Sequence, residues 1–211
     1  MSIVKETDPA RLASSIVYGT IKSNVSGGGK NCAVSYRMPN GNIRFLFKTE
    51  QLPTKFGISK WTDNAGGPDK YSMQVMLEAG EETYELMKAI DSANLEFVVA
   101  NQKALLEKTK GTLNKSSELI AEKGSFLVKE NQYGFYFTAK VEFNKQGDCT
   151  TLLVNKDRDV ITHDAVHGGS VICLLEFRGV WSNATGAWGM CAYLKQCVYT
   201  EEEAAVQQLL I

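Results

Sequence analysis

The feature that most constrains the fold is an alternation of apolar and mostly polar side chains over residues 133–143. From Tyr133 to Phe143, every second residue is aromatic or aliphatic. A period of two is the pattern of a β-strand that buries one face. Shorter segments of strand character recur at residues 15–21, 31–37, 43–49, 71–77, 150–154, 170–181 and 187–199. These segments predict a mainly β fold.

One long stretch departs from this pattern and predicts a helix over residues 80–108. Residues at steps of three and four form one stripe on it, with glutamates on the opposite face. The stripe consists of Tyr84, Met87, Ile90 or Asp91, Asn94, Phe97 and Val98. We expect a second short helix at 116–123 and an amphipathic one at 201–211. Residues 52–69, which contain Trp61 and the breaker Gly-Gly-Pro, are expected to form a loop.

The length of 211 residues fits one globular domain. We expect residues 12–78 to supply the first strands and a loop, 80–124 a helical insertion, 130–199 the closing strands and 201–211 a terminal helix. No apolar run approaches the about 20 residues of a membrane-spanning helix. The N-terminal residues lack the apolar core of a signal peptide. We therefore expect an intracellular protein that does not enter a membrane.

The net charge of −1 hides an uneven distribution of charge. Residues 21–60 contain seven basic side chains and one acidic one, whereas residues 76–100 contain six acidic and one basic. Salt screens charges beyond about 8 Å at physiological ionic strength, so a partner responds to the local charge. On the strand at 43–49, alternation places Arg44, Leu46 and Lys48 on one face. We expect a basic face on the sheet and an acidic helical side; the alternative is charge dispersed over solvated surfaces.

No residue pattern indicates catalysis or metal binding. The five cysteines include no Cys-x-x-Cys pair, so we expect reduced, uncoordinated thiols. His163 and His167 bracket Asp164, but we expect a loop there and find no third ligand nearby. The glycines before Lys30 lack the Gly-x-x-x-x-Gly-Lys-Ser/Thr pattern of a phosphate loop. The sequence therefore predicts no catalytic residue, no metal and no cofactor.

Aromatic and basic side chains share several faces that solvent can reach. Proteins that hold single-stranded nucleic acid stack bases on aromatic rings while lysine and arginine contact the phosphates. An aromatic residue on a strand can instead pack in the core, which is the alternative for each ring. The pairs are Tyr136 with Lys140, Tyr193 with Lys195, and Trp61 with Lys60. These pairs predict a surface for single-stranded nucleic acid.

Several short segments occur in a familiar order. The sequence reads Leu-Pro-Thr-Lys-Phe-Gly-Ile-Ser-Lys-Trp at 52–61 and Lys-Tyr-Ser-Met-Gln-Val at 70–75, before the acidic helix. It continues with Phe-Arg-Gly-Val-Trp at 177–181, Gly-Ala-Trp-Gly at 186–189 and Tyr-Leu-Lys-Gln at 193–196. Over residues 12–200 this order resembles the single-stranded-DNA-binding proteins of nucleocytoplasmic large DNA viruses. The layout is also similar to that of the T7-like phage single-stranded-DNA-binding proteins.

The resemblance implies an OB-fold-like five-stranded barrel with an inserted helical segment and a short C-terminal helix. It implies a non-catalytic protein that coats single strands, without strong sequence preference, in DNA replication, recombination or repair. Its partners would be single-stranded DNA, viral or phage replication proteins and, through the C-terminal helix, a second copy. Its place would be the cytoplasm, nucleus or viral factory of an infected cell. The expected nucleic-acid-binding residues are Lys30, Arg37, Arg44, Lys48, Lys55, Lys60, Trp61, Tyr136, Lys140, Tyr193 and Lys195.

Within this set we expect stacking on Trp61, Tyr136 and Tyr193, and phosphate contacts from Arg37, Arg44, Lys48, Lys60 and Lys140. One alternative is a structural or scaffold protein that uses the barrel for protein–protein assembly. Such a protein would form stable oligomers without affinity for nucleic acid. Another alternative is a metal-dependent nuclease built on Asp164 with His163 or His167.

Overall fold

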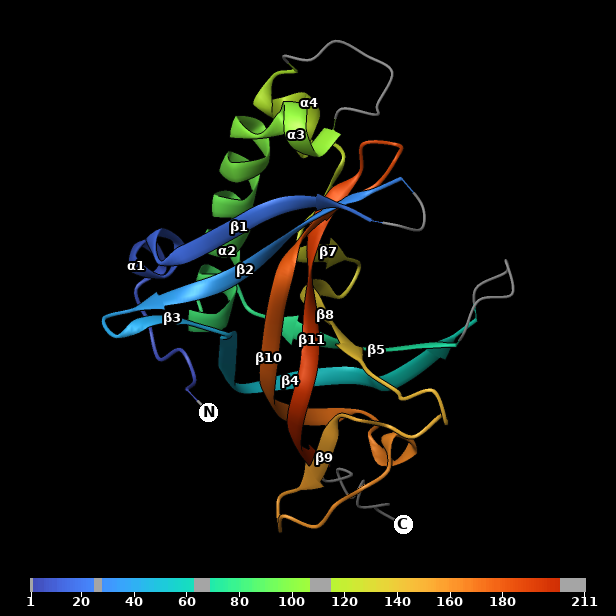
Figure 1. The fold of residues 1–211 in the computed structure, drawn as a ribbon. Coiled ribbons are helices and arrows are strands. Elements are labelled where there is room, and N and C mark those ends of the chain that lie inside the picture. Colours follow the sequence, from blue (N-terminus) through green and yellow to red (C-terminus); the bar gives the residue numbers. More distant parts are fainter. Residues whose placement is uncertain (1, 25–27, 63–68, 107–114, 202–211) are drawn as a thin grey trace, which may run out of the picture.

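The computed structural model describes residues 2–24, 28–62, 69–106 and 115–201 (Figure 1). Its strands are β1 (Ile16–Ser23), β2 (Lys30–Met38), β3 (Gly41–Ile43), β4 (Phe45–Trp61), β5 (Lys70–Leu77), β6 (Gly124–Ser125), β7 (Lys129–Asn131), β8 (Gly134–Val141), β9 (Leu152–Asn155), β10 (Gly169–Ser182) and β11 (Trp188–Glu201). Its helices are α1 (Pro9–Ser14), α2 (Glu82–Ala100), α3 (Gln102–Leu106), α4 (Ser117–Ala121) and the short 3-10 helix η1 (His163–Ala165).

Five of these strands close into a barrel. β4 pairs with β5 and β5 with β8, both antiparallel. β8 runs parallel to β11, β11 antiparallel to β10, and β10 returns antiparallel to β4, which completes the ring. This is the connectivity of an OB-fold, with α2, α3 and α4 inserted between its second and third strands. The prediction of a mainly β, OB-fold-like barrel with a helical insertion is confirmed.

A second ribbon extends the barrel sheet. The end of β10, from Gly179 to Ser182, leaves β4 and pairs with the start of β2, and β2 pairs with β1. Gly179 permits this approach, because a Cβ there would lie 2.5 Å from the Cys32 carbonyl oxygen. In Figure 1, β1 and β2 cross in front of α2. The N-terminal hairpin is therefore an extension beside the barrel and does not form its wall.

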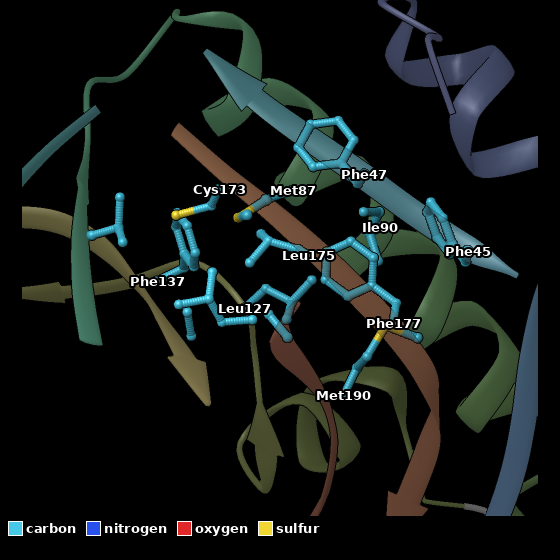
Figure 2. Close-up of a cluster of buried hydrophobic side chains, with 14 of the residues drawn as sticks. Phe45, Phe47, Met87, Ile90, Leu127, Phe137, Cys173, Leu175, Phe177 and Met190 are labelled. Atoms are coloured by element: carbon cyan, nitrogen blue, oxygen red, sulfur yellow. The ribbon is translucent and has the colours of Figure 1, made fainter. Parts of the chain in front are cut away.

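The core lies between α2 and the barrel strands. Figure 2 shows Met87 and Ile90 of α2 beside Phe45 and Phe47 of β4 and Phe177 of β10. These side chains are all buried. Of the stripe predicted for this helix, Asp91, Asn94 and Val98 are also buried, whereas Tyr84 and Phe97 are only partly buried. The helix is also joined to the chain before β7. There the buried carboxylate of Asp91 accepts hydrogen bonds from the backbone N–H groups of Leu127 at 2.8 Å and Val128 at 3.0 Å.

The prediction of a loop over residues 52–69 is wrong for its first ten residues, because β4 continues to Trp61. The register between β4 and β5 shifts between Thr54 and Ile58. Gly57 lies in this bulge with a φ of +63°, in the left-handed region that glycine favours. The extra residues break the period of two while the strand pairing resumes beyond them. From the sequence pattern alone, such an interruption in the period of two predicts a loop.

The expectation that Leu46 shares an open face with Arg44 and Lys48 is also wrong, because Leu46 is 1% exposed. The N-terminal segment covers this position: the Val4 N–H donates to the Leu46 carbonyl at 2.8 Å. The predicted C-terminal helix at 201–211 lies outside the described residues apart from Glu201, which ends β11. No helix in the described ranges is long and apolar enough to cross a membrane.

Candidate nucleic-acid interface

A groove of about 760 Å³ lies on the outer surface of the barrel, where the end of β4, β5, β8 and β11 meet. It is mixed in character, with aromatic rings, lysines and small polar side chains in one place. Its lining consists of Trp61, Asp69, Lys70, Tyr71, Ser72, Thr138, Lys140, Val141, Glu142, Phe143, Asn144, Lys145, Gly147 and Tyr193. OB-folds bind oligonucleotides on the face of their second and third strands and on the loop between the first two. Here those strands are β5 and β8.

Strand register brings the groove residues together. Trp61 faces Lys70 on the last rung between β4 and β5, and Ser72 faces Lys140 between β5 and β8. Lys140 in turn lies beside Tyr193 of β11. Side chains alternate between the two faces of a strand, so the burial of Met73 and Ala139 inside the barrel directs Ser72 and Lys140 outward. The core pattern therefore determines which side chains reach the groove.

Two arrangements of rings border the groove. Trp61 is 53% exposed, and the Lys70 ammonium lies 4.7 Å from the centre of its ring. Tyr71 and Phe143 stack on one another with their centroids 4.0 Å apart and an interplanar angle of 27°. His163 packs edge-on against both of these rings. The tryptophan therefore offers open ring surface, whereas Tyr71 and Phe143 form a ring pair supported from the side.

The charge of the groove is only slightly positive. Its lining holds three lysines and two acids. Asp69 is paired with Lys60, whose Nζ lies 2.7 Å from its carboxylate, and this hydrogen bond holds the pKa of Asp69 below its usual range. None of the seven basic residues counted between 21 and 60 lines this groove, and its lysines come from later in the chain. At this groove, the expectation of a basic face formed by residues 21–60 is therefore not met.

A chain of ion pairs runs along the groove edge through Glu142. Arg178 donates from Nη1 and Nη2 to the two Glu142 oxygens at 2.6 and 2.5 Å, and from Nε to Glu176 at 2.8 Å. Glu176 also accepts from Arg44 at 2.7 Å, and Glu142 from Lys195 at 3.2 Å. The hydrogen bonds from Arg178 lower the pKa of Glu142. The network joins β10 and β11 to the residues at the end of β8 and just before β4, and it favours the ionised form of Glu142.

The structure brings together some of the residues predicted from sequence. Trp61, Lys140 and Tyr193 line the groove. Lys60 and Lys195 adjoin it through ion pairs with the lining residues Asp69 and Glu142. Arg44 is connected to it only indirectly, through Glu176 and Arg178. The other five predicted residues, Lys30, Arg37, Lys48, Lys55 and Tyr136, do not line it.

These five residues are spread over the molecule. Arg37 lies beside the N-terminal segment, and Lys30 faces Ser182 at the far end of the added ribbon. Lys48, on β4, lies opposite Leu174 of β10, and Tyr136, on β8, lies opposite Met76 of β5. Lys55 sits 4.0 Å from the centre of the Tyr133 ring, in a separate groove of about 600 Å³.

Sequence reasoning missed Tyr71, Phe143, Lys70 and Lys145 in the groove, and Arg178 at its edge. By alternation Tyr71 shares a face of β5 with the buried Met73, but it stands near the start of the strand, where it is only partly buried. A signal was present in the closely spaced residues Lys70 and Tyr71, which directly follow the predicted loop. Arg178 gave no signal of this kind, because its partners Glu142 and Tyr193 come from distant segments of the chain.

The remaining candidate chemistry stays unsupported. All five cysteines are free. His163 contacts Asp164 at 3.3 Å, while His167 is exposed nearby. Within the part of the chain that the structure describes, no three His, Cys, Asp or Glu side chains gather as a metal site would require.

No protein-family model and no curated protein matches this chain. Among solved structures, the chain is similar to a single-stranded DNA-binding protein from bacteriophage Enc34 in complex with single-stranded DNA. The TM-score is 0.49 at 14% identity, over 88% of this chain and 96% of that one. A second structure of the Enc34 protein gives 0.46 at 13%, covering 92% and 96%. The single-stranded DNA-binding protein encoded by bacteriophage T7 gives 0.48 at 9%, covering 77% and 89%.

Proposed function

We propose that this chain binds single-stranded DNA in the groove bordered by Trp61, Lys140 and Tyr193, without strong sequence preference. The observation that carries the proposal is the meeting of open ring surface and lysines on the β5–β8 face of an OB-fold barrel. Every base has a face that can stack, so ring stacking tolerates any sequence. Lysines add attraction to the phosphates, which depends on salt.

The proposed roles follow from position in the groove. Trp61 provides a stacking surface, because half of it is exposed at the groove edge. Lys140 and Lys145, on either side of Glu142, provide positive charge for the backbone. The Tyr71–Phe143 pair forms an apolar wall against which a base or sugar can pack.

The biological role that we propose is the coating of single strands during replication, recombination or repair, without catalysis by this chain. The partners would include viral replication proteins, and a second copy of the chain is a further candidate. A kinship with the proteins of nucleocytoplasmic large DNA viruses remains our prediction from the order of sequence segments. So do the intracellular location and the division of one domain at 12–78, 80–124, 130–199 and 201–211.

A scaffold role without DNA is the competing function. Fluorescence anisotropy of labelled oligo-dT and of a duplex of equal length, measured at 50 and 200 mM salt, distinguishes the two functions. The proposal predicts binding of the single strand that exceeds duplex binding and weakens at the higher salt. Stable oligomers in light scattering together with no dT binding at 50 mM salt would favour the scaffold.

A further inference from the structure

Cations flank the ring of Tyr193 on the sides of both neighbouring strands. The guanidinium carbon of Arg178, on β10, lies 4.1 Å from the ring centroid. The Lys140 ammonium, on β8, lies 5.6 Å from it. β10 and β8 are the two strands that pair with β11 on its opposite edges. Tyr193 is thus enclosed between cations and does not offer the open stacking face that the sequence suggested.

The guanidinium of Arg178 is held in one orientation. Its Nε donates to Glu176, and its two terminal nitrogens donate to the two oxygens of Glu142. The side chain is nevertheless 40% exposed. Because the guanidinium lies over the Tyr193 ring and three of its N–H groups are held at the edges, a base can approach it on the face turned away from the ring. A flat, positively charged surface is therefore fixed beside the groove.

The same contacts make Arg178 a poor phosphate ligand. A bidentate arginine–carboxylate pair is among the strongest hydrogen-bonded pairs in proteins. Three of the five guanidinium N–H groups already donate to Glu142 and Glu176, so a phosphate would have to displace one of these carboxylates to bind in the bidentate manner. A base needs only the open face, and guanidinium planes stack on bases as aromatic rings do.

We propose that the open face of the Arg178 guanidinium stacks on a nucleobase of the bound strand, with Tyr193 supporting it from the other side. In this arrangement Glu142 and Glu176 act as positioning residues that hold the plane. The inference rests on the proposed function, because it adds a second stacking surface beyond Trp61. It also replaces Tyr193 by Arg178 as the residue that touches the base.

The test exploits the difference between charge and shape. Arg178→Lys keeps the positive charge and loses the plane. We expect it to weaken oligo-dT binding by about 5- to 150-fold, the span of one base-stacking contact. We expect the slope of log affinity against log salt to stay unchanged. Full wild-type affinity in this variant would overturn the inference, and so would a slope reduced by about 0.7, the value of one lost phosphate contact.

Arg11→Lys is the matched control, because Arg11 also pairs with a carboxylate, that of Glu6, but lies outside the groove. We expect it to bind like the wild type. An abasic oligomer of the same length separates base from backbone, and Arg178→Lys should bind it as the wild type does. A loss of the same size on the abasic oligomer would contradict stacking.

A measurement on the wild-type protein covers the case in which Arg178→Lys fails to fold. In ¹⁵N-arginine spectra, an oligo-dA strand should shift the Arg178 Nε–Hε signal upfield, and the abasic strand should not. Equal shifts with both strands would overturn the inference. Wild-type binding of dT tests the proposed function separately: if it is absent, the function fails, whereas normal dT binding by Arg178→Lys removes only the role of Arg178.

Discussion

The Lys70 ammonium lies 4.7 Å from the centre of the Trp61 ring, across the last rung that joins β4 to β5. The attraction of an ammonium group to an indole face is worth about 0.5–1 kcal/mol at exposed sites. This contact restricts a half-exposed ring at the edge of the groove. Trp61 is therefore partly preorganised before any ligand arrives.

Trp61→Ala should weaken binding of oligo-dT by about 1–3 kcal/mol, because one stacked base loses its partner. Phe56→Ala is the matched control. Phe56 is on the same strand and 49% exposed, but it packs on Tyr133 outside the groove. Titration by anisotropy should show a loss for the first variant and none for the second. Equal losses in both would place the DNA along β4 and not in the groove.

Lys145→Gln should reduce the slope of log affinity against log salt by about 0.7, the single-strand value for one phosphate contact. Lys145 lines the groove, in a loop where Asn144 accepts from the backbone N–H of Asp148. Lys156 provides the control, since it occupies the same place in the matching loop from Asn155 to Asp159, outside the groove. Lys156→Gln should leave the slope unchanged. A slope that changes equally in both variants would indicate diffuse attraction.

Asp91 should make stability fall as pH rises from about 4 to about 6. Burial raises the pKa of this carboxyl from 3.8 to about 6, against the opposing effect of its two backbone hydrogen bonds. The folded state thus binds a proton more tightly than the unfolded state. The resulting stabilisation is complete below pH 4 and lost by pH 6, a change of about 3 kcal/mol.

Urea unfolding of wild type and Asp91→Asn across this range checks the prediction. The difference in unfolding free energy between the two proteins should change with pH, because the amide does not titrate. A difference that stays constant across this pH range would contradict the prediction.

Gly57→Ala should destabilise the fold by more than the about 1–3 kcal/mol of a strained backbone position. At Gly57, φ is +63° and a Cβ would lie 1.9 Å from the Val166 carbonyl oxygen. Gly41→Ala is the comparison, because φ is +119° there and no atom lies within 4 Å of the added carbon. Thermal melts should rank Gly57→Ala clearly below Gly41→Ala. Equal melting temperatures would show that the bulge tolerates a side chain.

The strands and the long helix could be predicted because burial imposes periods of two and three to four on the sequence. The stripe through Met87 and Val98 and the alternation around Phe137 correspond to buried faces. The end of β4 could not be predicted, since the bulge at Gly57 shifts the period while strand pairing continues. Closure of the barrel depends on β8 meeting β11, a contact between distant segments that leaves no local pattern.

The candidate site was only partly predictable for the same reason. Residue type was sufficient to single out Trp61 and Lys140, because an exposed ring and a lysine on a polar face have few other uses. Residue type could not show that Lys55 lies beside Tyr133 in another groove. Nor could it show that Arg178 covers Tyr193, which depends on three adjacent strands.

Quenching of tryptophan fluorescence by oligo-dT tests the central claim most directly. Of the three tryptophans, Trp188 is 1% exposed and Trp61 borders the groove. Stacking on Trp61 predicts a saturable loss of emission that follows the same salt dependence as anisotropy, and that is lost in Trp61→Phe. DNA binding seen by anisotropy without quenching, or with equal quenching in Trp61→Phe, would contradict the placement of DNA in this groove.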